Sequence, residues 1–211
     1  FLNRYLEFMT PAIKKYNGFI DKYIGDAVMA LFPTSAEDAV LAAVEMNKQL
    51  AVYNSDEPTS GKDPVNMGVG IHIGQLVLGT IGRELRMETT VISDTVNASA
   101  RLENLNKTYK TNVLISGAVR DELSPDIQSF CRLIDRTQVK GKVEFLDVYE
   151  VYLTDDEPLA EAKSKSKKVL TSIVDSYYLG DIKAAKKLLG ELEDDTKKDT
   201  VISFWKTRLK T

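Results

Sequence analysis

The sequence predicts an α+β fold in which an antiparallel sheet sandwich is followed by a small helical extension. Helical and strand-like periods alternate through the first 153 residues, and tight-turn signals join neighbouring strands into hairpins. From about residue 154 the periodicity is helical only. Hairpins among interleaved helices favour an α+β sandwich over a doubly wound parallel sheet.

The elements of the first 153 residues follow one another in a readable order. Apolar residues at helical spacing predict a first helix through Leu6, Met9 and Ile13 that ends at Asn17-Gly18. The next elements are strands 19–24 and 27–32 around a Gly25-Asp26 loop, a helix over 35–53, strands 65–73 and 76–81 as a second hairpin, a helix over 94–105, and strands 113–116 and 145–153.

Residues 154–211 form a second unit, which begins with a charged linker and continues with three short helices. Each helix is indicated by apolar residues at helical spacing. The residues are Val169, Ile173 and Tyr177; Ala184, Ala185, Leu188, Leu189 and Leu192; and Val201, Trp205 and Leu209. We expect these helices to pack against the first unit, with a partner-binding module as the alternative.

Composition excludes several classes of protein. The chain has 211 residues, of which 43% are hydrophobic and 28% charged, a balance typical of a soluble globular protein. Its one cysteine cannot form an internal disulfide, so we expect a domain of a reducing compartment, the cytoplasm. One cysteine and one histidine are also too few for a zinc site of the usual kind. A net charge of −3 predicts no nucleic-acid partner. The chain begins with Phe1, without an initiator methionine or a signal-peptide pattern, so we expect it to begin inside a longer protein.

Two familiar nucleotide-binding motifs and the common catalytic triads are not supported. The sequence contains no Gly-x-x-x-x-Gly-Lys-Ser/Thr run, and residues 68–74 miss the dinucleotide fingerprint by one position. A serine or cysteine triad would need His72, which strand alternation places on the face opposite Val69 and Ile71. We therefore do not assign a catalytic role to His72.

Two other places carry candidate chemistry. Asp26 lies at the tip of the first hairpin, where its carboxylate is able to face a hard cation such as Mg²⁺, although Gly-Asp is also ordinary turn chemistry. Asn97 and Arg101 are four residues apart and so share one helix face. The guanidinium of Arg101 suits phosphate, and the alternative is a polar outer face of an amphipathic helix.

Four motifs, taken together, resemble the class III adenylate and guanylate cyclase catalytic domain over residues 1–153. The segment FIDKYIGDAVMALF (19–32) resembles the metal-binding hairpin of that family, and VGIHIG (69–74) with GTIG (79–82) resembles the following hairpin. The segment TVNASARL (95–102) resembles the helix that stabilises the transition state, and VKGK (139–142) resembles a phosphate-contacting loop. The resemblance implies a ferredoxin-like antiparallel sheet sandwich and conversion of a nucleoside triphosphate to a 3′,5′-cyclic nucleotide and pyrophosphate.

The resemblance also assigns roles to individual residues. Asp26 would be one of two aspartates that hold two Mg²⁺ or Mn²⁺ ions, and the other lies, in the family, before the position where this chain begins. We therefore expect little or no turnover from residues 1–211 alone. Arg101 would stabilise charge on the α-phosphate and Asn97 would orient the ribose. Lys140 would hold the terminal phosphates, and Lys142 either shares that work or is a solvated loop lysine.

Two further positions imply the choice of base. Lys22 matches the lysine that donates to adenine N1 in adenylate cyclases, and guanylate cyclases carry glutamate there. Thr90 takes the partner position, where its hydroxyl is able to meet the 6-amino group. These residues favour ATP, and a guanylate cyclase is the alternative.

The resemblance further implies a homodimer whose active sites straddle two chains, and a sensor or regulatory domain N-terminal to the cyclase domain. A cyclase-like dimerisation or regulatory module without activity remains a second hypothesis.

Overall fold

The computed structural model describes residues 2–55, 64–83, 86–92, 94–138, 145–192 and 198–210, with the backbone alone for residues 2, 3, 77–83 and 86–92. Its helices are α1 (Leu2–Lys15), α2 (Ala36–Ser55), α3 (Asp94–Tyr109), α4 (Gly117–Asp121), α5 (Pro125–Ser129), α6 (Glu157–Tyr178), α7 (Ile182–Gly190) and α8 (Thr200–Arg208). Its strands are β1 (Phe19–Ile24), β2 (Ala27–Leu31), β3 (Val69–Ile71), β4 (Val77–Arg83), β5 (Arg86–Ile92), β6 (Val113–Ser116), β7 (Cys131–Gln138) and β8 (Phe145–Val151).

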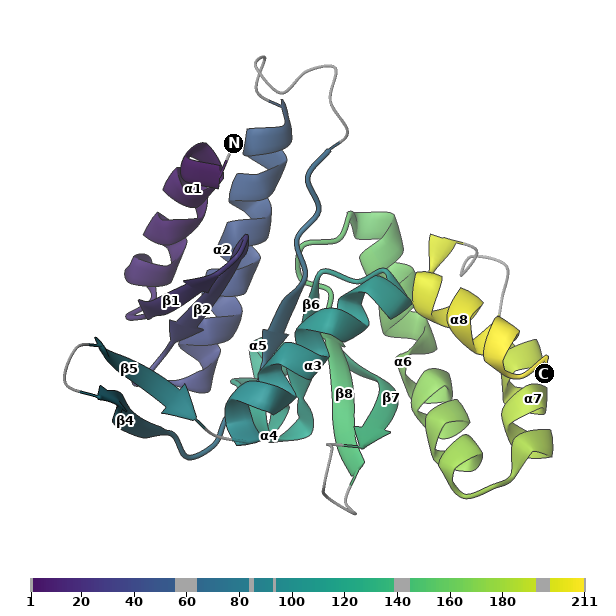
Figure 1. Cartoon of the computed structure of the whole chain (residues 1–211). Coiled ribbons are helices and arrows are strands. Elements are labelled where there is room, and N and C mark those ends of the chain that lie inside the picture. Colours follow the sequence, from purple (N-terminus) through teal and green to yellow (C-terminus); the bar gives the residue numbers. More distant parts are fainter. Residues whose placement is uncertain are drawn as a thin grey trace.

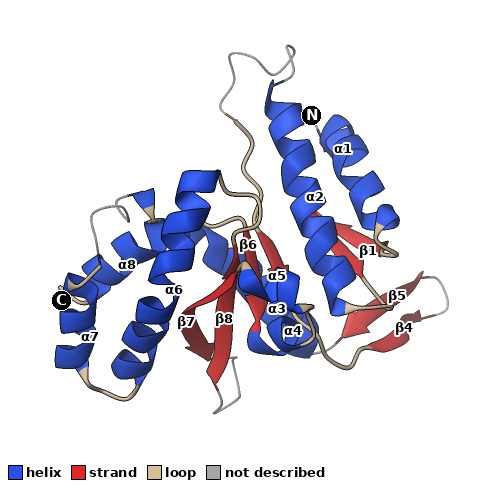
Figure 2. Ribbon diagram, turned by 180° about the vertical axis from the view of Figure 1, so that it is seen from behind, coloured by secondary structure: helices blue, strands red, loops and turns tan. Residues whose placement is uncertain are grey.

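The strands of the described residues form one larger sheet and two hairpins. The larger sheet has the order β3-β6-β8-β7, and the hairpins are β1-β2 and β4-β5. Every pairing is antiparallel except the one between β3 and β6. Helices α6, α7 and α8 gather at the β7 end of the sheet, whereas α1, α2 and the first hairpin lie at the opposite end (Figures 1 and 2). The mixture of helices with mainly antiparallel sheets confirms the predicted α+β class.

The first helix and the first hairpin form as predicted. Helix α1 ends where Asn17 adopts a φ of 59° and the amide of Gly18 donates to the carbonyl of Ile13 at 2.9 Å. In the hairpin, Ile24 faces Ala27, and Gly25 takes a φ of 65° that favours glycine.

The predicted second hairpin, 65–73 with 76–81, is wrong. Strand β3 pairs in parallel with β6, with Val69 opposite Val113, while β4 pairs with β5. Residue alternation records which face of a strand is buried and not which strand lies beside it. Gly70 instead allows helix α3 to approach β3, because a Cβ at this position would lie 2.2 Å from the amide nitrogen of Glu103.

The larger sheet is covered on both faces. Val113 and Ile115 of β6 pack in a cluster with Val40 and Ala43 of α2, whereas Leu114 points to the other face. There a single apolar cluster joins α3, the sheet and helices α6–α8. Its buried members are Leu102, Tyr109, Leu114, Leu133, Ile134, Val148, Leu170, Ile173, Val174, Ala185, Leu189, Val201, Ile202, Trp205 and Leu209. The C-terminal helices therefore share a hydrophobic core with the sheet.

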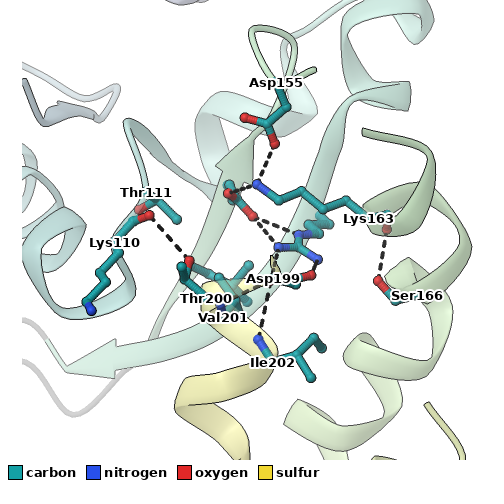
Figure 3. Close-up of polar contacts among 12 residues, drawn as sticks. Lys110, Thr111, Asp155, Lys163, Ser166, Asp199, Thr200, Val201 and Ile202 are labelled. Carbon is teal, nitrogen blue, oxygen red and sulfur yellow. Dashed lines mark hydrogen bonds and ion pairs between the residues drawn. The ribbon is translucent and has the colours of Figure 1, made fainter. Parts of the chain in front are cut away.

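Buried charges add a second connection between the sheet and the C-terminal helices (Figure 3). Arg132 of β7, whose side chain is fully buried, pairs with Glu150 of β8 at 2.6 Å and with Asp199, which precedes α8. Lys163 of α6 pairs with the same Glu150 at 2.7 Å and with Asp155. Asp199 also caps α8 by accepting hydrogen bonds from two amides at its start.

Among the described helices, none is long and apolar enough to cross a membrane.

Candidate active site

The tip of the first hairpin presents Asp26 to solvent. Asp26 is exposed, and within the described part of the chain its carboxylate makes no hydrogen bond or ion pair. Burial, and secondly the charge of Asp26, raise the pKa of Tyr5 in α1. An exposed carboxylate that pairs with no cationic side chain of the described residues fits the donor type that Mg²⁺ and Mn²⁺ prefer. No group of three or more His, Cys, Asp or Glu side chains that could hold a metal ion gathers among the described residues, so the metal role of Asp26 stays a prediction.

Lys22 lies on β1, four residues before Asp26, and is half-buried. Its ammonium is 3.4 Å from Oδ2 of Asp21, a buried oxygen that accepts no hydrogen bond from the described residues. A register shift in the pairing with β2 lies between Ile20 and Lys22, so Asp21 is the extra residue of a β-bulge. Sequence reasoning passed over Asp21, although an acidic residue inside an apolar strand was the available signal.

Helix α3 is held against β3 by its buried face, so that its other face is exposed. Ser99 donates to the carbonyl of Gly70 at 2.8 Å, and Asn106 donates to the carbonyl of Val69 at 3.0 Å. Asn97 and Arg101 lie one turn apart on the exposed side. The structure therefore brings these two predicted residues together.

Arg101 also reaches the end of strand β7. Its Nε donates to the hydroxyl of Thr137 at 2.8 Å. The strand ends at Gln138, immediately before the segment that contains Lys140 and Lys142. These two lysines lie outside the described residues. Strand β7 was not predicted from the sequence, so the contact between Thr137 and Arg101 was not predicted either.

Thr90 is described only through its backbone, which lies in β5 opposite Gly79. Its side chain is outside the described part of the structure, so the predicted contact with the purine stays a prediction.

The surroundings of the one histidine and the one cysteine are those of residues that stabilise the fold. Nδ1 of His72 lies 2.8 Å from the hydroxyl of Ser116, the residue that caps α4. Cys131 is buried, and burial raises the pKa of its thiol to about 11. A thiol with such a pKa is almost entirely protonated at neutral pH and is a poor nucleophile.

The described residues thus form an α+β domain with mainly antiparallel sheets, an exposed carboxylate on a hairpin, and an amide and a guanidinium on one helix face. The sequence model of the adenylate and guanylate cyclase catalytic domain matches residues 1–154. The chain therefore belongs to this family, as its motifs predicted.

Individual relatives support the same conclusion. The chain is 44% identical over 157 residues to an adenylate cyclase of Anabaena cylindrica, and 42% identical over 159 residues to the terminal-differentiation specific adenylate cyclase of Dictyostelium discoideum. Each match covers 72% of this chain but only 31% and 7% of the respective relative. The solved guanylyl cyclase Cya2 has a TM-score of 0.61 at 30% identity, over 74% of this chain and 80% of its own. The fold is thus shared by adenylyl and guanylyl cyclases and does not by itself select the base.

Proposed function

We propose that this domain converts ATP to 3′,5′-cyclic AMP and pyrophosphate at sites shared between two copies of the chain. The observation that supports this proposal most directly is the state of Asp26 and Arg101. Both side chains are exposed, and neither is paired with an opposite charge among the described residues. Such uncompensated charges suit a metal nucleotide, whose phosphates and cation bring the complementary charges.

In this reaction the ribose 3′-oxygen attacks the α-phosphorus, and pyrophosphate leaves. Asn97 orients the ribose by hydrogen bonding, and Arg101 donates to the α-phosphate oxygens, where negative charge grows. Lys140 would hold the terminal phosphates, and Lys142 would either share that work or be a solvated loop lysine. Asp26 would hold Mg²⁺ or Mn²⁺, and the two ions used at such a site lower the pKa of the 3′-hydroxyl and neutralise phosphate charge.

The choice of ATP rests on Lys22 and Thr90. An ammonium donates to adenine N1, which is an acceptor, whereas guanine carries a proton at N1 and would place a donor against a donor. A mispaired donor costs about 1 to 3 kcal/mol, so these contacts give a preference of about 10- to 100-fold. The two relatives above, both named as adenylate cyclases, favour the same choice.

The proposal of a shared site is supported by the positions of its residues on separate elements of the chain. Asp26 lies on the hairpin beside α1 and α2, whereas Asn97 and Arg101 lie on α3, which packs on β3 and β6 (Figure 1). In a two-fold homodimer each site takes Asp26 from one protomer and the base, ribose and phosphate contacts from its partner. We place the domain in the cytoplasm, where ATP is available, downstream of a sensor or regulatory domain.

Two alternatives deserve a test. The likeness to the guanylyl cyclase Cya2 favours the first alternative, a guanylate cyclase that uses GTP in place of ATP. A dimerising regulatory module without activity is the second alternative, since no group of three or more potential metal ligands gathers among the described residues.

The native protein that contains this chain would be incubated with ATP or GTP at equal concentration, with Mg²⁺ or with Mn²⁺. We expect cyclic AMP and pyrophosphate in equal amounts, a preference for ATP, and no product from Asp26→Asn. Cyclic GMP as the main product would identify a guanylate cyclase. A folded dimer that forms neither product would identify a regulatory module.

A further inference from the structure

Arg101 differs from the later arginines of the chain in its partner. Each of the four arginines after it pairs with at least one carboxylate. The pairs are Arg120 with Asp121, Arg132 with Glu150 and Asp199, Arg136 with Asp147 and Asp175, and Arg208 with Asp135. Arg101 instead donates to the hydroxyl of Thr137, and within the described residues this is its one partner. Among the described residues, no carboxylate therefore compensates the charge of the Arg101 guanidinium.

The hydrogen bond to Thr137 uses the nitrogen nearest the backbone. A guanidinium has five N–H donors in one plane, and donation from Nε at 2.8 Å fixes that plane while both terminal nitrogens stay available. Arg101 is exposed, and an exposed arginine without such a bond samples many rotamers, at an entropic cost when it must adopt one. Thr137 has only 8% of its surface exposed, and its β-branched side chain is stiff, which makes its hydroxyl a fixed point.

A second hydrogen bond between the same helix and strand fixes the distance that the first one spans. Tyr109, two turns after Arg101 on α3, donates to Oδ2 of Asp135 at 2.6 Å. Asp135 precedes Thr137 by two residues on β7, so both side chains lie on one face of the strand. Asp135 is 3% exposed and also accepts from Tyr178 of α6 and Arg208 of α8. Among the described residues, two side-chain hydrogen bonds thus join helix α3 to strand β7, and one of them involves Arg101.

We propose that Thr137 is a positioning residue for the cyclase reaction, which holds Arg101 by Nε so that both terminal nitrogens of the guanidinium face the α-phosphate. The inference rests on the proposed function, because it assigns Arg101 to the transition state. A threonine acting in this way contributes to turnover and not to ground-state binding, since it preorganises a donor that acts as charge develops.

The test compares Thr137→Val, which keeps the shape and removes the acceptor, with Thr137→Ser, which keeps the hydroxyl. In the native protein, Thr137→Val is expected to lower kcat for cyclic AMP formation about tenfold, the value of one hydrogen bond, with KM for ATP changed less than twofold. Thr137→Ser is expected to retain kcat within about threefold of the wild type. Tyr109→Phe, which removes the other attachment, serves as the structural control and is expected to change kcat less than Thr137→Val does.

A double-mutant cycle identifies the route of the effect. If Thr137 acts through Arg101, Thr137→Val has no further effect in an Arg101→Ala background. The proposal would be overturned if Thr137→Val lowered kcat equally in the wild-type and Arg101→Ala backgrounds. It would also be overturned if kcat fell in proportion to thermal stability, and to the same extent, in Thr137→Val and Tyr109→Phe. An unchanged kcat would overturn it as well, as would a raised kcat, which would mean that the hydrogen bond holds Arg101 away from the nucleotide. A wild-type protein without cyclase activity would overturn the proposed function, and this inference with it, whereas an active wild type with an insensitive Thr137→Val would overturn this inference alone.

Discussion

The polar residues of the junction between the sheet and the C-terminal helices differ from those of the candidate active site. In the junction, the side chains of Arg132 and Asp199 are fully buried and bonded to each other, and Glu150 joins them at 3% exposure. At the candidate site, Asp26 and Arg101 are exposed and meet no opposite charge among the described residues.

This difference separates polar residues that stabilise the fold from those that await a ligand. A buried charge destabilises a protein unless the chain itself supplies its partner, so structural charges come in complete networks. A charge that acts on a substrate has to be left uncompensated until the substrate binds. The two kinds of residue should therefore respond to mutation in opposite ways, the first in stability and the second in turnover.

The largest expected effect is the loss of stability when a buried charge of the junction is removed. Asp199→Ala leaves the buried guanidinium of Arg132 with only Glu150 and removes the cap of α8, so we expect the free energy of unfolding to fall by about 3 to 5 kcal/mol. Urea denaturation measures it. Asp199→Asn, which keeps the shape and an acceptor for the cap, should lose less. A loss below about 1 kcal/mol for the alanine variant would mean that this network does not hold the extension in place.

Arg101→Ala should show the reverse behaviour. Because Arg101 is exposed, the free energy of unfolding should change little. Loss of a donor to the α-phosphate should lower kcat about 10²- to 10³-fold, with a smaller change in KM. Arg101→Lys, which keeps the charge without the planar fork, should recover only part of the activity. A raised KM with normal kcat would assign Arg101 to ground-state binding instead.

A smaller effect is expected from the residues that choose the base. Lys22→Glu combined with Thr90→Cys should move the ratio of kcat/KM values from ATP toward GTP by about 10- to 100-fold, because an acceptor then faces the protonated N1 of guanine. Each single variant serves as a control for general loss of activity. An unchanged ratio in an active double variant would remove the assigned roles of both residues.

The smallest expected effect is a change in the free energy of unfolding at acidic pH. Burial alone would raise the pKa of Asp199, but the hydrogen bonds and charge of Arg132 outweigh it and hold this pKa below its usual value. The stability that Asp199 contributes is thus complete above its unfolded pKa of about 3.9 and is lost as the pH falls through the lower folded value. The stability difference between the wild type and Asp199→Asn should shrink below about pH 4, as measured by urea denaturation at several pH values. A difference that grows in acid would contradict the assigned pairing.

Local signals account for what the sequence predicted well. The Gly25-Asp26 turn and the strands beside it are set by neighbouring residues, so the first hairpin and the position of Asp26 at its tip were predictable. The face shared by Asn97 and Arg101 also follows from helix periodicity alone.

Contacts between distant segments account for what the sequence did not reveal. Strand β3 was assigned to the wrong partner because β6, which pairs with it, comes more than 40 residues later. Strand β7 was missed because Arg132, Asp135 and Arg136 interrupt its apolar pattern. Their charges are compensated mainly from other segments, including Asp199 before α8 and Arg208 within it. Without β7, no sequence argument leads to Thr137.

The measurement that tests the shared active site most directly is complementation between two inactive variants of the native protein. Asp26→Ala and Asn97→Ala would be mixed under conditions that exchange protomers, with tags that measure how much mixed dimer forms. Each mixed dimer contains one site in which neither residue is altered, so a random mixture should recover about a quarter of the wild-type cyclic AMP formation. Mixed dimers that form and stay inactive would contradict the account.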